Sequence, residues 1–170
     1  PMHPSNAFTI EELNANLEDI LHACEQDVQK LIGRKDVSLD LCSKIENGKL
    51  RVDQGVIAGC AGGLYDSIYE AASILKGHTG GCGDYALSVY PGSQPIMMEL
   101  VRTGVISDLM ASGATIRTAF CGPCFGAGDV PANGALSIRH TTRNFPSREG
   151  SKPGSGQLAG VAVSYTHLRA

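Results

Sequence analysis

The N-terminal part of the chain, from Thr9 to Ile32, follows one amphipathic pattern. Thr9 and Glu12 have the spacing of a helix capping box, and the apolar positions of residues 13–32 then recur every three or four residues. This pattern predicts a helix over about 10–32 that ends at Gly33.

Beyond this helix, short apolar runs alternate with amphipathic stretches. Asn47-Gly48 lies between two apolar runs in residues 39–52 and predicts a β-hairpin. Further strands are predicted over 55–59, 85–90, 115–120, 136–141 and 158–163, and helices over 64–76, 93–103 and 105–111. Alternating strands and helices are typical of βαβ units, so we expect an α/β fold in three layers, with a mostly parallel sheet between flanking helices.

The composition indicates one well-packed globular domain. Of the 170 residues, 42% are hydrophobic and 18% are charged, which excludes a disordered chain. The net charge of −3 offers no basic surface, so neither nucleic acid nor a membrane is expected as a partner. Because no apolar run reaches the ~18 residues of a membrane span and no signal-peptide pattern is present, we expect a cytoplasmic location.

Six cysteines carry the main chemical signal in the sequence. Cys24 falls on the apolar stripe of the predicted helix and Cys42 in a predicted strand, so both are predicted to be core residues. Cys60 and the pair Cys121 and Cys124 each follow a predicted strand. Since ligands bind at the carboxyl edge of parallel sheets, we expect these three thiols to converge there.

The sequence Cys121-Gly122-Pro123-Cys124 allows three kinds of chemistry. It is the disulfide-exchange motif of thioredoxins, although Phe120 replaces the usual Trp and helix-breaking glycines follow it. Together with Cys60 and Cys82 it completes a four-thiolate set for structural zinc, although those two cysteines form no second close pair. With Cys60 alone it offers three thiolates to an iron–sulfur cluster, which leaves one iron open as a Lewis acid.

A longer set of motifs narrows these alternatives, because together they resemble the aconitase superfamily, which includes the aconitases and the large subunits of isopropylmalate isomerases. The motifs are the stretch 119–126, the Gly-rich turn at Cys60 lying 61 residues before Cys121, the segment Tyr90-Pro91-Gly92-Ser93-Gln94, and Arg143-Asn144-Phe145 with Arg148. The resemblance covers about residues 55–163 and is closest to the aconitase-like hydratases of bacteria. It implies that the chain corresponds to roughly the third domain of a multidomain enzyme, and the first residue, Pro1 rather than Met, agrees with a fragment of a longer protein.

This resemblance assigns roles to five residues. It implies that Cys60, Cys121 and Cys124 ligate a [4Fe-4S] cluster and that Arg143 and Arg148 bind substrate carboxylates, for which a guanidinium fork is well suited. The acid–base residues of the family have no counterpart here, so no catalytic residue is expected in this chain and the isolated chain is expected to be inactive.

The sequence also departs from the family pattern. Aconitases have Cys-Thr-Asn-Ser where this chain has Cys60-Ala61-Gly62-Gly63, and they have Asn where Thr142 stands. Both changes remove polar groups beside the expected cluster, so the resemblance does not extend to citrate as the substrate. The remaining polar candidates are expected to be structural, namely His78 and His140 as satisfied histidines and Asp84 and Asp129 as turn residues.

We therefore expect part of a hydro-lyase that adds or removes water across a hydroxy-polycarboxylate, with the other domains of the parent chain as partners. Residues 1–52 are expected to precede or belong to the cluster-binding domain of residues 53–163, and residues 164–170 are expected to be a non-native tail. Two alternatives stay open: a cluster-binding sensor without turnover, and a redox protein that uses Cys121 and Cys124.

Overall fold

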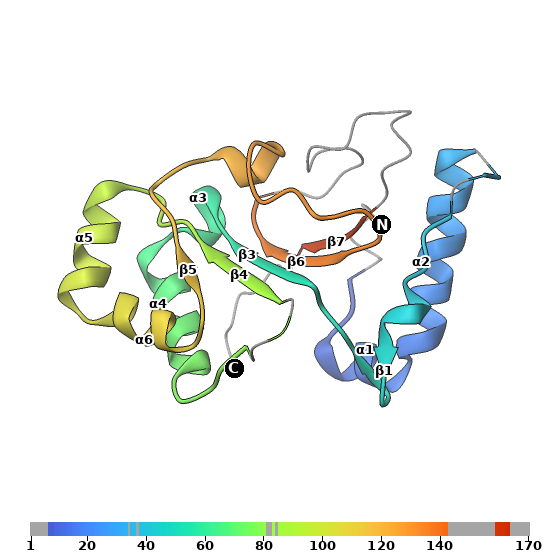
Figure 1. The fold of residues 1–170 in the computed structure, drawn as a ribbon, viewed down its shortest axis with the longest axis horizontal. Helices are drawn as coiled ribbons and strands as arrows, with labels where there is room; N and C mark the ends of the chain where they lie inside the picture. The colour runs from blue at the N-terminus through green and yellow to red at the C-terminus, as the bar shows by residue number, and fades with distance from the viewer. Residues whose placement is uncertain are drawn as a thin grey trace.

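A five-stranded parallel sheet forms the centre of the molecule (Figure 1). The computed structural model describes residues 7–33, 35–36, 38–80, 83, 85–142 and 159–163. The strands are β3 (Gln54–Ile57), β4 (Ala86–Val89), β5 (Thr115–Ile116), β6 (Leu136–His140) and β7 (Gly160–Val163). They lie in the order β5-β4-β3-β6-β7, and every neighbouring pair is parallel. The predicted α/β fold is thereby confirmed.

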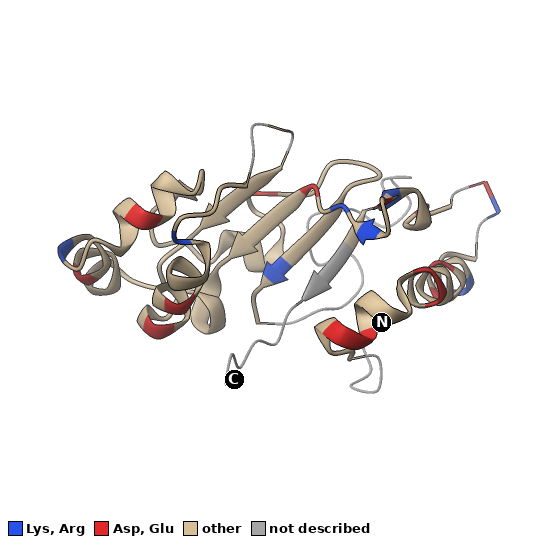
Figure 2. Cartoon of the chain, turned by 90° about the horizontal axis from the view of Figure 1, so that it is seen from below, with Lys and Arg blue, Asp and Glu red and all other residues tan. Residues whose placement is uncertain are grey.

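Three helices pack on one face of this sheet, namely α4 (Tyr65–Leu75), α5 (Gln94–Arg102) and α6 (Val105–Ala111). Their core is fully buried at Ile68, Leu100 and Leu109, and it packs against Val89 of β4. Ser93 caps α5 as predicted, because its hydroxyl accepts the backbone N–H of Ile96. Charged residues lie mainly on the helices and loops, and few positions of the strands are charged (Figure 2).

The N-terminal helix begins and ends as predicted but is divided in two. Thr9 and Glu12 form the reciprocal capping box of α1 (Ile10–Ala15), and Gly33 ends α2 (Leu17–Ile32) in a left-handed conformation with φ of 64°. The break falls at Asn16, whose φ of −130° is not helical.

A second core joins these helices to the hairpin and to β6. The hairpin strands β1 (Ile45–Glu46) and β2 (Lys49–Leu50) are antiparallel, as the Asn47-Gly48 turn predicts. The buried members of this core are Leu17, Leu21, Leu41 and Leu136. Cys24 and Cys42 are partly buried against it, but the prediction of a strand at Cys42 was wrong.

Cys42 begins a short 3₁₀ helix, η2 (Cys42–Lys44), instead of a strand. The reason is local, because the Asp40 side chain accepts the N–H of Ser43 at 3.0 Å and the Asp40 carbonyl accepts the Ser43 hydroxyl. Such short-range hydrogen bonds compete with strand pairing.

The strand order creates a single switch point between β3 and β6. From β3 the chain runs through β4 to β5 at one edge, and it then returns across the sheet to β6 on the other side of β3. In open parallel sheets, ligands bind beyond the carboxyl ends of the strands at such a point. The connection that returns, residues 117–135, carries the Cys-Gly-Pro-Cys motif.

Candidate functional site

Two cysteine-bearing segments meet at the switch point. Cys60 lies in α3 (Gly59–Gly62), directly after β3, and Cys124 lies in the short 3₁₀ helix η3 (Gly122–Phe125). The two elements are in contact. An ideal Cβ on Gly59 would lie 2.5 Å from the Sγ of Cys124. Because consecutive Cα atoms are about 3.8 Å apart, the Cα of Cys60 is within about 8 Å of that sulfur.

Glycine is required on the Cys60 side of this contact. Gly59 has φ of +78°, and any side chain there would collide with Cys124. Gly62 approaches β6 so closely that an ideal Cβ would lie 2.1 Å from the carbonyl oxygen of His140. The next segment packs here as well, since the N–H of Gly92 donates to the carbonyl of Gly63 at 2.8 Å. The Gly-rich turn therefore holds the carboxyl ends of β3, β4 and β6 together.

The second cysteine segment is a single tight turn. The N–H of Cys124 donates to the carbonyl of Cys121 at 3.1 Å, and the turn ends at Gly126 with φ of 80°. Cys121 is exposed, whereas Cys124 is 2% exposed. The predicted strand over 115–120 was too long, because β5 ends at Ile116 and the chain reaches Cys121 as irregular backbone.

A buried arginine holds this turn against the sheet. Arg139 on β6 is fully buried, and its guanidinium donates to the carbonyl of Pro123 at 3.0 Å and to the carbonyl of Asp129. It also donates to the side chains of Gln54 at 3.0 Å and Ser137 at 3.1 Å. All these acceptors are oxygens of uncharged groups, so the guanidinium acts as a planar fork that positions the turn.

A second polar contact joins the connection of residues 117–135 to Tyr90, which directly follows β4. The hydroxyl of Tyr90 donates to the Asp129 carboxylate at 2.7 Å. Burial, followed by the hydrogen bond to Asp129, raises the pKa of Tyr90 to about 12. Asp129 has a positive φ of 47°, in the left-handed region. Arg117 lies on the other side of this carboxylate, 4.0 Å away.

Little in the sequence indicates this network. Arg139 falls within the strand predicted over 136–141, and its partners lie 2 to 85 residues away along the chain. One signal was present: strand alternation places Arg139 on the face opposite Ile138, the same face as Ser137. Two polar residues on one face of a central strand indicate that a polar connection covers that face.

The spacing of the three sulfurs bears on the choice of metal. Within the described ranges, the ligand atoms of Cys60, Cys121 and Cys124 do not all lie within 4.8 Å of one another. A single zinc ion needs its thiolates about 3.8 Å apart, given a Zn–S bond of about 2.3 Å. A cluster binds each thiolate through a different iron and therefore needs a wider spacing.

One buried hydroxyl at this edge has no hydrogen-bond partner among the described residues. Thr141 is 2% exposed, and its hydroxyl finds no hydrogen-bond partner in the described structure. It follows Arg139 by two residues, so extending the strand alternation by one step places it on the face that carries the cysteine turn. Buried hydroxyls are normally paired, so this one is suited to a group bound at the site.

The other predicted residues divide into two sets. Arg143, Arg148, Cys82 and Asp84 lie outside the described residues. His78 is exposed just after α4, and His140 is partly buried at the end of β6.

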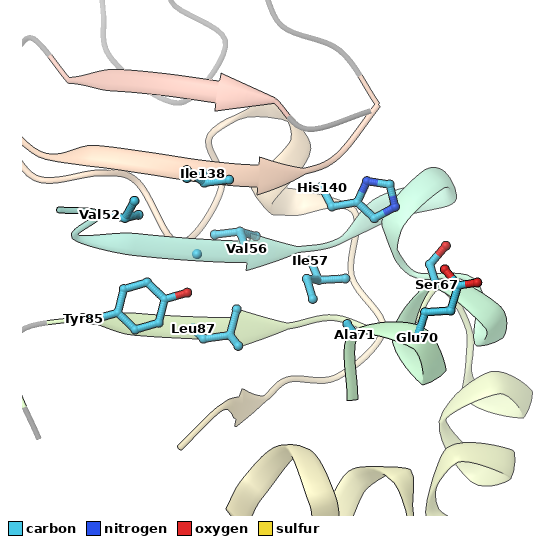
Figure 3. A pocket seen from close by; sticks show the side chains of 11 residues that line it. Val52, Val56, Ile57, Ser67, Glu70, Ala71, Tyr85, Leu87, Ile138 and His140 are labelled. Atoms are coloured by element: carbon cyan, nitrogen blue, oxygen red, sulfur yellow. The ribbon is translucent and has the colours of Figure 1, made fainter. Parts of the chain in front are cut away.

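A groove of about 390 Å³ lies on the helical side of the sheet, away from the cysteine turn. Its floor is formed by apolar residues of the strands, and Ser67, Glu70 and His140 lie at one end (Figure 3). None of the three cysteines lines it.

Comparisons with known proteins give one consistent result. A family model described as the Aconitase family (aconitate hydratase) matches residues 1–166. The 3-isopropylmalate dehydratase large subunit of Caldanaerobacter subterraneus subsp. tengcongensis is 31% identical over 155 residues, which is 89% of this chain and 36% of that protein. The proteins of the same name from Desulfitobacterium hafniense and Clostridium kluyveri are 36% and 27% identical, over 71% and 95% of this chain. The chain spans between 29% and 39% of the length of these three relatives.

In the part of the chain that the structure describes, no helix combines the length and the apolar character needed to cross a bilayer.

Proposed function

Because the chain belongs to the aconitase family, we propose that it is the cluster-bearing part of a hydro-lyase acting on a hydroxy-polycarboxylate. The observation that supports this most directly is the contact of Cys124 with Gly59, the residue before Cys60, at the switch point of the sheet. The curated relatives are named 3-isopropylmalate dehydratase large subunit, so we propose a malate derivative of that type as substrate. The cytoplasm is the proposed location, because thiols stay reduced there.

The donor set fits a [4Fe-4S] cluster held by Cys60, Cys121 and Cys124. The three sulfurs do not all lie within 4.8 Å of one another, Cys60 and Cys121 are exposed, and the Thr141 hydroxyl, without a hydrogen-bond partner in the described structure, lies on the same face of the sheet as the turn of residues 121–126. Such a cluster, with only three thiolate ligands, would supply a Lewis-acidic iron that polarises a substrate hydroxyl.

We assign substrate binding and the positioning of the turn to side chains of this chain. Arg143 and Arg148 are proposed to hold the substrate carboxylates in bidentate hydrogen bonds. Arg139 keeps the turn between Cys121 and Cys124 in place through the Pro123 carbonyl. Groups from the remainder of the parent chain, or from a partner subunit, are proposed to remove and return the proton.

Anaerobic reconstitution with iron and sulfide tests the ligand set. We expect about four irons and four sulfides per chain and a loss of both in Cys60→Ser, Cys121→Ser and Cys124→Ser, because a hydroxyl binds iron poorly in this setting. Cys24→Ser is the matched control and should keep its iron, since Cys24 belongs to the second core. Tightly bound zinc without sulfide would contradict the proposal.

Two further measurements separate the alternatives. The full-length protein should hydrate or dehydrate a hydroxy-polycarboxylate, and a cluster without turnover would favour a sensor. Disulfide reductase activity of the reduced, iron-free chain would favour the redox protein. The structure of the Cys-Gly-Pro-Cys turn disfavours the redox protein, because η3 spans four residues and does not begin a longer helix.

A further inference from the structure

A second group of metal-ligating side chains lies on α2 and η2, beside the second core and not at the carboxyl edge of the sheet. His22 and Glu25 are one turn apart on α2, and Cys42 begins η2. One ligand atom from each residue lies within 4.8 Å of the other two, and no other group of three histidine, cysteine or acidic residues is as close in the described chain.

The carboxylate of this group is held in place by the backbone. One oxygen of Glu25 accepts the N–H of Leu41 and, at 2.9 Å, the N–H of Cys42. The other oxygen lies 3.5 Å from Nδ1 of His22. One oxygen therefore fixes the side chain and leaves the second directed toward the histidine.

The charges around the thiol favour a cation. Burial first, and then Glu25, Glu18 and Asp40, raise the pKa of Cys42. All the charged neighbours that act on this thiol are acidic. The nearby ammonium of Lys44 is bound to Asp53 at 2.8 Å.

We propose that His22, Glu25 and Cys42 bind a zinc-type divalent cation, with water as the fourth ligand. Nitrogen, oxygen and sulfur donors together are the set that zinc prefers. Tetrahedral zinc requires ligand atoms about 3.3–3.8 Å apart, so each pair must close by at most about 1.5 Å. His22, whose side chain is 64% exposed, can supply part of this movement by rotation.

Binding of one cation releases one proton. The Cys42 thiol loses its proton to solvent as its sulfur bonds to the cation, and no electrons are transferred. The affinity therefore rises with pH, by up to tenfold per unit while the thiol is protonated. The bound ion would link α2 to η2 and stabilise the packing of these two elements against each other.

Cobalt titration under anaerobic conditions tests this site. The probe is Co²⁺ alone, added to the full 170-residue chain carrying Cys60→Ser, Cys121→Ser and Cys124→Ser, so that the proposed cluster ligands are absent. We expect one tight equivalent with a thiolate-to-cobalt charge-transfer band. Cys42→Ser should abolish this band, and His22→Ala should weaken binding at least tenfold. Cys24→Ser and His78→Ala, matched controls outside the group, should bind normally.

The outcomes are separable from those of the proposed function. A band that survives Cys42→Ser, or no thiolate band at all, would overturn the second site without affecting the cluster. If the triple variant does not fold, the otherwise wild-type chain is titrated instead. There Cys42→Ser should bind one cobalt fewer than Cys24→Ser, and equal stoichiometries would overturn the proposal.

Discussion

Arg139→Met is the sharpest test of the polar network beneath the cysteine turn. The arginine is fully buried and donates at least four hydrogen bonds, two of them to the carbonyls of Pro123 and Asp129. Methionine fills much of the same volume but leaves the carbonyl of the buried Pro123 without this donor, whereas the carbonyl of Asp129 still accepts from Nε2 of Gln54 at 3.1 Å. A carbonyl left without a donor costs about 1–3 kcal/mol and each of the three other lost hydrogen bonds about 0.5–1.5 kcal/mol, so we expect the free energy of unfolding to fall by about 4 kcal/mol.

Urea unfolding followed by circular dichroism measures this change. With a slope of about 2 kcal/mol/M, the midpoint should fall by about 2 M. Arg139→Lys should also lower it, because a single ammonium cannot reproduce the planar fork. Arg102→Met is the control, since Arg102 is exposed and its ion pair among the described residues is with Glu99 on its own helix, and its midpoint should not change.

A second readout separates loss of stability from loss of position. At low temperature and without urea, folded Arg139→Met should retain less iron after reconstitution than wild type, because Pro123 lies between two of the proposed ligands. A midpoint within 0.5 M of wild type, a shift of about 1 kcal/mol or less, would refute the reasoning about this network.

Three further predictions concern single positions. Gly59→Ala and Gly77→Ala should each cost about 1–2 kcal/mol of stability, because both glycines have φ of +78°. Only the new methyl group at position 59 would collide with the sulfur of Cys124, so only Gly59→Ala should also lower the iron content. Thr141→Val should leave the metal-free chain as stable as wild type or up to about 1 kcal/mol more stable, because the hydroxyl is unpaired in the described structure; a loss above 1 kcal/mol in urea unfolding would show that it is paired. For Asp53, burial acts to raise the pKa, but hydrogen bonds from Lys44 and the Leu136 N–H outweigh it and lower the pKa. The ionised carboxylate therefore stabilises the fold above about pH 4 and this stabilisation is lost as the pH falls further, so Asp53→Asn should flatten the acid limb of a stability–pH profile.

Local patterns predicted most elements of the fold. The capping box at Thr9, the turn at Asn47-Gly48 and the stop at Gly33 each depend on nearby residues, and each is confirmed. The break at Asn16 was missed because the apolar spacing continues across it, although Asn is a favoured residue at helix starts.

The remaining errors and omissions depend on long-range contacts. The strand that begins at Thr115 stops at Ile116, because Ile116 pairs with Val89 and Val89 is the last residue of β4. The role of Arg139 was not predicted because three of its four acceptors lie 10 to 85 residues away along the chain. The contact between Gly59 and Cys124 was expected in outline, since both segments follow strands, but the need for a glycine at this point is visible only in three dimensions.

The unequal burial of the cysteines has a practical consequence for purification. In air, oxidants and alkylating reagents reach Cys60 and Cys121 first, while Cys124 is shielded beneath Gly59. Thiols oxidised beyond the sulfenic state are not restored by ordinary reductants. A preparation stored aerobically would thus lose its capacity to take up iron through damage at two sulfurs while the third still titrates as intact, and a count of remaining thiols would overstate the usable fraction of the sample.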